Sequence, residues 1–141
     1  MNINPDQHKA ASSHWVLIVD DEKSMCDMIS NMLAEEKVEI VTAGDGATAL
    51  RLVEKRGTEP LLVVVDVLMP GMDGLTLARK LSARLTRSKI IMMSGHLSDD
   101  SWWPADLREI TFLTKPFRMA ELTELVDAAR AEARAESRDK P

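Results

Sequence analysis

Short apolar runs alternate along this chain with segments in which apolar residues recur every three or four positions. We assign the runs to β-strands at residues 15–19, 38–42, 61–66, 89–93 and 110–114. Continuous runs such as residues 61–65 are typical of strands that are buried on both faces of a sheet. Repeated strand-then-helix order favours parallel strands joined by right-handed crossovers. The pattern therefore predicts an α/β fold with a doubly wound five-stranded parallel sheet, in which the βα unit occurs five times.

The helical segments are recognised by their apolar faces and, in two cases, by a residue that can cap the first turn. Asp45 and Asp73 each precede a glycine, and an aspartate there can accept a hydrogen bond from the free amides of a helix start. The apolar faces are formed by Met25, Ile29, Met32 and Leu33, by Ala47, Leu50 and Val53, by Leu77, Ala78, Leu81 and Leu85, and by Leu122, Leu125, Val126 and Ala129.

The segment between the fourth and fifth predicted strands departs from this pattern. Residues 96–109 show poor helical period and contain Pro104, which fits only the first turn of a helix. We therefore expect an atypical fourth helix that is short or displaced. Trp102 and Trp103 are adjacent, so on a helix they point about 100° apart and at least one should be exposed or cover a neighbouring element.

Charge and composition exclude several classes of function. The chain has 23 Asp and Glu against 18 Lys and Arg, whereas nucleic-acid binding depends on clustered cations. Its longest apolar stretch, residues 61–69, is interrupted by Asp66 and is far shorter than the roughly 20 residues that cross a bilayer. The first residues lack the pattern of a signal peptide, and the single cysteine, Cys26, fits core packing in a reducing compartment. We expect a cytoplasmic protein that binds neither nucleic acid nor membrane.

Polar side chains follow the predicted strands at the edge where doubly wound sheets bind their ligands. They are Asp20 and Asp21 after the first strand, Asp66 at the end of the third, Ser94 after the fourth and Lys115 after the fifth. Three carboxylates within about 4 to 6 Å would repel one another by several kcal/mol. Lys115 offsets one charge, and the remainder suits a hard divalent cation such as Mg²⁺. A carboxylate beside Mg²⁺ and a lysine can attack phosphorus, so the pattern indicates phosphoryl transfer to an aspartate.

Four motifs together resemble the receiver domains of two-component response regulators, the CheY-like superfamily. They are Val-Asp-Asp-Glu at residues 19–22, Asp-Val-Leu-Met-Pro-Gly-Met-Asp-Gly at 66–74, Met-Ser-Gly-His at 93–96 and Lys-Pro-Phe at 115–117. The resemblance implies a phosphorylation-activated signalling switch. Such a protein is no enzyme in the usual sense, because it catalyses only its own phosphorylation and dephosphorylation.

The resemblance also implies a role for each site residue. Asp66 would be the phosphoacceptor, Lys115 would pair with the phosphoryl group, and Ser94 and Phe112 would be the switch hydroxyl and the switch aromatic. The Lys115–Pro116 bond would be cis. The ligands of Mg²⁺ would be Asp20, Asp21, Asp66 and the backbone carbonyl of Leu68.

The partners follow from the same resemblance. The phosphoryl donor would be a sensor histidine kinase or a histidine phosphotransfer protein. The output would be contact with a downstream protein, or a homodimer, through the face of the fourth helix, fifth strand and fifth helix.

We divide the chain into a flexible lead-in at residues 1–14, a receiver domain at 15–130 and a charged tail at 131–141, and expect no output domain.

Two other readings stay open at this point. One is a receiver fold that acts as an interaction module without phosphorylation, which loss of an acidic, serine or lysine site residue would favour. The other is an aspartate-dependent phosphatase or a flavin-binding protein; the phosphatase would need a second acid at position 68, where this chain has leucine. Leu68 and His96 occupy the variable positions that, in this family, influence hydrolysis of the aspartyl phosphate.

Overall fold

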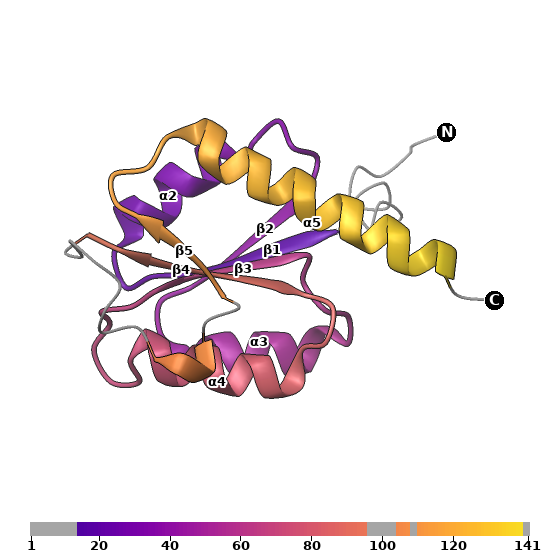
Figure 1. The fold of residues 1–141 in the computed structure, drawn as a ribbon. Helices are drawn as coiled ribbons and strands as arrows, with labels where there is room; N and C mark the ends of the chain where they lie inside the picture. Colours follow the sequence, from indigo (N-terminus) through magenta and orange to yellow (C-terminus); the bar gives the residue numbers. More distant parts are fainter. Residues whose placement is uncertain (1–13, 96–103, 108–109, 140–141) are drawn as a thin grey trace, which may run out of the picture.

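A computed structural model describes residues 14–95, 104–107 and 110–139 of the chain. A five-stranded sheet lies between two layers of helices (Figure 1). The elements are β1 (Trp15–Val19), α2 (Lys23–Met32), β2 (Glu39–Ala43), α3 (Gly46–Arg56), β3 (Leu62–Asp66), α4 (Gly74–Arg84), β4 (Lys89–Ser94), the 3-10 helix η1 (Ala105–Leu107), β5 (Thr111–Thr114) and α5 (Met119–Asp139).

The sheet is parallel throughout and has the strand order β2-β1-β3-β4-β5. This confirms the predicted doubly wound α/β fold. The predicted strand limits were wrong by one residue at several ends. β2, β3 and β5 begin one residue later than predicted, because apolar character extends beyond the hydrogen-bonded ladder, and β2 and β4 end one residue later, at Ala43 and Ser94. Val38 packs against the core just before β2, and Ile110 does so just before β5, where its amide bonds the carbonyl of Leu107 in a turn.

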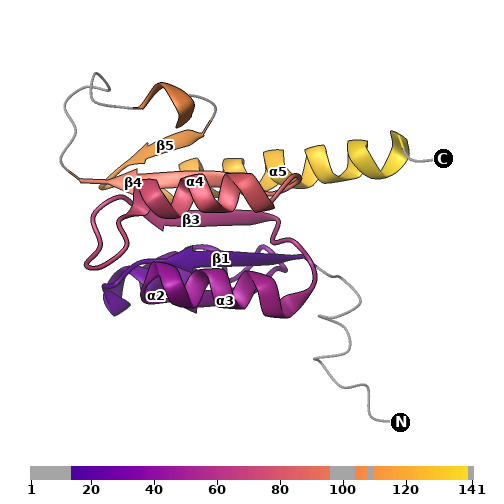
Figure 2. The ribbon, with the colours of Figure 1, turned by 90° about the horizontal axis from the view of Figure 1, so that it is seen from below.

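Side chains alternate between the two faces of the sheet and so build two cores. Leu17, Val63 and Met92 face α3 and α4, whereas Ile18, Val64 and Ile91 face α2 and α5. Figure 2 shows α3 and α4 lying across the sheet on the first of these faces. All six side chains are fully buried, so the sheet is covered on both sides as the continuous apolar runs predict.

Both predicted helix caps are confirmed. A side-chain oxygen of Asp45 accepts a hydrogen bond from the amide of Thr48 at 2.7 Å, and one of Asp73 accepts from the amide of Thr76 at 2.8 Å. No helix in the described ranges is both long enough and apolar enough to span a membrane. The division into lead-in, receiver and tail stays a prediction, and α5 continues to Asp139 within the segment assigned to the tail.

Between β4 and β5, the described residues form the single 3-10 turn η1. Leu107 is buried there, and the guanidinium of Arg79 on α4 contacts both carboxylate oxygens of Asp106, at 2.8 and 3.3 Å. The predictions on His96, Trp102 and Trp103 lie outside the described residues.

Gly74 lets α4 begin in direct contact with the end of β3. Its amide donates to the carbonyl of Val67 at 3.0 Å, and a Cβ at this position would overlap the carbonyl oxygen of Asp66. Gly74→Ala is therefore expected to lower the free energy of unfolding by about 2–3 kcal/mol. Gly44→Ala is the control, with a change within about 0.5 kcal/mol, because nothing lies within 4 Å of the added carbon. If urea unfolding showed the same loss of free energy for both variants, the close approach of α4 to the end of β3 would be contradicted.

Candidate functional site

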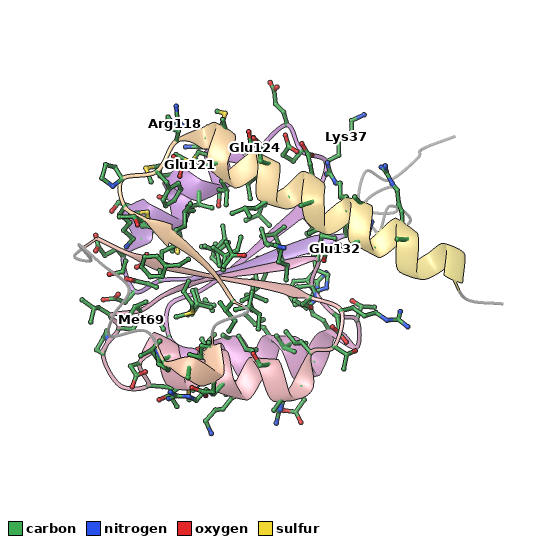
Figure 3. The ribbon with its side chains drawn as sticks, in the orientation of Figure 1. Lys37, Met69, Arg118, Glu121, Glu124 and Glu132 are labelled. Carbon is green, nitrogen blue, oxygen red and sulfur yellow. The ribbon has the colours of Figure 1, made fainter. Side chains whose placement is uncertain are left out.

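The parallel register brings the candidate residues to one edge of the sheet. Val19 pairs with Val65, so Asp20 follows β1 beside Asp66 at the end of β3. Ser94 ends β4 and pairs with Thr114, which places Lys115 next to it. Figure 3 shows two residues from the surrounding loops at this edge, Met69 from the loop after β3 and Arg118 from the loop after β5.

The structure brings the three predicted acidic residues together. Asp20, Asp21 and Asp66 each offer one carboxylate oxygen, and these oxygens all lie within 4.8 Å of one another. Asp20 and Asp66 are 1% and 6% exposed, whereas Asp21 is an exposed residue. Negative charge is therefore concentrated where little water reaches two of the carboxylates.

Asp20 is held by hydrogen bonds at three of its polar groups. Its amide donates to the carbonyl of Ala43 at 3.1 Å, and its Oδ1 accepts from the amide of Glu22 at 2.9 Å. Its carbonyl oxygen accepts from the thiol of Cys26 at 3.5 Å. Its fourth polar atom, Oδ2, is buried and has no hydrogen-bond partner among the described residues.

Lys115 provides the positive charge that the sequence predicts at this edge. Its Nζ lies 3.6 Å from Oδ2 of Asp20 and 3.5 Å from Oδ2 of Asp66. The backbone fixes its position, because the Lys115 amide donates to the carbonyl of Ser94 at 2.8 Å and the Lys115–Pro116 bond is cis, as expected. One ammonium group thus faces a cluster of three carboxylates, which leaves negative charge uncompensated.

The electrostatics of Asp66 reflect this imbalance. Burial raises the pKa of its carboxyl group, and the charge of Asp20 raises it further. Lys115 and the amide of Leu68, which donates to Oδ1 at 3.3 Å, act in the opposite direction without cancelling the shift. An oxygen-only ligand set, with a buried Asp20 Oδ2 that accepts no hydrogen bond from the described residues, fits a hard divalent cation, whose charge would relieve the repulsion.

The remaining predicted residues lie around this cluster. Ser94 is buried at the end of β4, and Phe112 is half-buried in β5 and packs against the core on the side of α3 and α4. The Leu68 side chain is 63% exposed beside the phosphoacceptor candidate. Their positions agree with the predicted roles, and the roles themselves stay predictions.

Two features of the site were not found by sequence reasoning. Cys26 is buried, as expected, but periodicity gave no sign that its thiol contacts the carbonyl of Asp20. Gly74 was interpreted only as the residue after a cap, whereas it also allows α4 to approach the backbone of Asp66. A glycine at the first position of a helix, directly after a strand-end motif, is the signal that could have indicated this.

Comparison with known sequences agrees with this geometry. The family model described as the response regulator receiver domain matches residues 16–127. The sensory transduction protein RegX3 of Mycolicibacterium smegmatis (strain ATCC 700084 / mc(2)155) is 33% identical over 107 residues, which are 76% of this chain and 46% of RegX3. The alkaline phosphatase synthesis transcriptional regulatory protein PhoP of Bacillus subtilis (strain 168) is 30% identical over 114 residues, 80% of this chain and 47% of PhoP. The chain spans about half the length of these curated relatives.

Solved structures show the same fold. A response regulator receiver domain protein from Clostridium thermocellum has a TM-score of 0.77 at 22% identity, covering 86% of this chain and 98% of that one. The response regulator TrrA of Thermotoga maritima, in complex with Mg²⁺-BeF, has a TM-score of 0.70 at 29% identity, covering 82% and 98%. Because the family match spans most of the chain and includes every residue of the acidic cluster, the chain belongs to the response regulator receiver domain family.

Proposed function

We propose that the chain is a phosphorylation-activated signalling switch of a two-component system. Asp66 receives the phosphoryl group from a phosphohistidine of a sensor histidine kinase or of a histidine phosphotransfer protein. One observation carries this proposal: a nearly buried Asp66 carboxylate stands among Asp20, Asp21 and the ammonium group of Lys115 at the carboxyl edge of the sheet. Both curated relatives are signalling or regulatory proteins by their names.

Mg²⁺ is the cofactor that we propose for this site. Asp20, Asp21, Asp66 and the backbone carbonyl of Leu68 would hold it. The oxygen-only donor set supports this choice, as does TrrA, which was solved in complex with Mg²⁺-BeF. When bound, the ion supplies positive charge against the oxygens of the phosphoryl group in transfer.

The chain's own residues account for the rest of the transfer. A carboxylate oxygen of Asp66 attacks the phosphorus, the bond from phosphorus to the donor imidazole nitrogen breaks, and its electron pair stays on that nitrogen. The ammonium group of Lys115, which pairs with the Asp66 carboxylate before the transfer, then pairs with a phosphoryl oxygen. The Ser94 hydroxyl donates a hydrogen bond to a second phosphoryl oxygen, and this bond stabilises the aspartyl phosphate.

The same hydroxyl connects phosphorylation to output. When Ser94 turns toward the phosphoryl group, Phe112 moves into the space that it leaves. The surface formed by β5 and α5, which the sequence predicts to be shared with a fourth helix, then changes and binds a downstream protein or a second copy of this chain. Shifting such an equilibrium from 1:99 to 99:1 requires about 5.5 kcal/mol of differential stabilisation.

The first test is the intact mass of the protein after incubation with Mg²⁺ and acetyl phosphate. Wild-type protein is expected to gain one phosphoryl group, and Asp66→Asn none, because an amide is a poor nucleophile of nearly the same shape. Asp73→Asn is the matched control and should still be modified. Asp73 is an exposed helix cap, and asparagine caps equally well.

Two outcomes would contradict the proposal in different ways. An acid-labile adduct on Asp66→Asn would show that another residue is the phosphoacceptor. An unmodified wild-type protein with intact fold would favour the interaction module that acts without phosphorylation.

Leu68 is expected to make the aspartyl phosphate long-lived. Its exposed aliphatic side chain stands next to Asp66 and offers no group that could orient an attacking water molecule. Leu68→Asn and Leu68→Glu should therefore increase phosphate release from the phosphorylated protein by about tenfold or more. Leu68→Met, which keeps an apolar side chain, should leave the rate within about twofold. Equal rates in all four proteins would show that residue 68 does not control access of water.

A further inference from the structure

The thiol of Cys26 is a buried polar group that the proposed phosphoryl transfer does not use. Cys26 is the only cysteine of the chain, lies in the first turns of α2 and is 6% exposed. Its Sγ donates to the backbone carbonyl oxygen of Asp20 at 3.5 Å. The contact joins α2 to the end of β1, where two of the acidic site residues follow one another.

The carbonyl that Cys26 binds belongs to the peptide group between Asp20 and Asp21. Because a peptide group is planar, fixing the direction of this carbonyl also fixes the direction of the Asp21 amide. The Asp20 side chain is fixed separately, by the hydrogen bond from the Glu22 amide to Oδ1. A hydrogen bond to the Asp20 carbonyl opposes rotation of this peptide group, and the thiol of Cys26 donates such a bond.

The other end of the thiol contact is rigid. The Cys26 amide donates to the carbonyl of Glu22 at 3.2 Å, which closes the first turn of α2. Ile29, one turn further along, is fully buried in the core between the sheet, α2 and α5. The thiol hydrogen bond thus connects a packed helix to the turn that carries Asp20 and Asp21.

We propose that Cys26 is a positioning residue for the metal-binding carboxylates of Asp20 and Asp21, acting through its S–H hydrogen bond to the Asp20 carbonyl. The role rests on the proposed function, since it requires that these carboxylates bind Mg²⁺. It differs from plain core packing, in which only the volume of the sulfur atom would matter. A variant that removes the hydrogen-bond donor and a variant that replaces the sulfur but keeps a donor distinguish the positioning role from core packing.

The first experiment measures Mg²⁺ affinity from amide chemical shifts in NMR titrations. Cys26→Ala removes the donor and should weaken binding about threefold, the size expected for loss of one modest hydrogen bond. Cys26→Ser loses the sulfur volume but keeps a hydroxyl donor, so its affinity should stay within about 1.5-fold of wild type. Val126→Ala removes apolar volume from the same core on α5, not on α2, and should leave the affinity unchanged. Urea unfolding of each variant reports any general loss of stability.

The second experiment needs no metal. Since the chain has one cysteine, its S–H stretching band in the infrared spectrum belongs to Cys26 alone. The band of the folded protein should lie at lower frequency than that of the urea-unfolded protein if the thiol donates to a carbonyl more strongly than it does to water. A band at the frequency of a free thiol in an apolar solvent would overturn the proposal.

The outcomes distinguish this role from the function on which it rests. Unchanged Mg²⁺ affinity in Cys26→Ala, or equal weakening in the alanine and serine variants, overturns the positioning role and leaves the proposed function intact. Wild-type protein that binds no Mg²⁺ contradicts both. Weakening confined to the alanine variant, together with a lowered S–H frequency, supports the positioning role.

Discussion

Repulsion among Asp20, Asp21 and Asp66 is the constraint on which the rest of this structure depends. Their oxygens lie within 4.8 Å of one another, and two of the three carboxylates are nearly buried. At such separations the repulsion is several kcal/mol even at a protein-like effective dielectric. The chain tolerates it because each strand beneath the site is packed on both faces by apolar side chains. The buried sheet thus holds together charges that would otherwise separate.

A second carboxylate shows what a purely structural site looks like in the same fold. Glu59, before β3, is partly buried, and burial alone would raise its pKa. It accepts hydrogen bonds from the amides of Thr86, Arg87 and Ser88 at 3.2, 2.8 and 3.1 Å, and the net effect is a lowered pKa. Asp66 has one such amide donor and one ammonium neighbour, and its pKa is raised. Glu59 is thus a structural carboxylate whose charge is stabilised by hydrogen bonds, whereas Asp66 is a site carboxylate whose charge is destabilised by burial and by a neighbouring carboxylate.

Sequence reasoning predicted the parallel sheet, both aspartate caps and the convergence of the acidic residues with Lys115, because each depends on strong local patterns. Apolar runs fix which residues enter the sheet, and parallel topology then fixes which strand ends meet. The predicted starts of β2 and β5 were wrong by one residue, since Val38 and Ile110 are apolar without belonging to the ladder. The thiol contact of Cys26 and the close approach at Gly74 escaped prediction because they depend on the distance between a helix and a strand end, which periodicity does not encode.

The most direct test of the central claim is the free energy of unfolding of wild type and Asp66→Asn, each with and without Mg²⁺. Without Mg²⁺, the variant should be more stable by about 1 kcal/mol, because it removes one of the crowded charges. Mg²⁺ at about ten times its dissociation constant should stabilise the wild type by about 1.4 kcal/mol and the variant by clearly less. A wild type that is the more stable protein without Mg²⁺, and that gains no more from the ion than the variant does, would contradict the account.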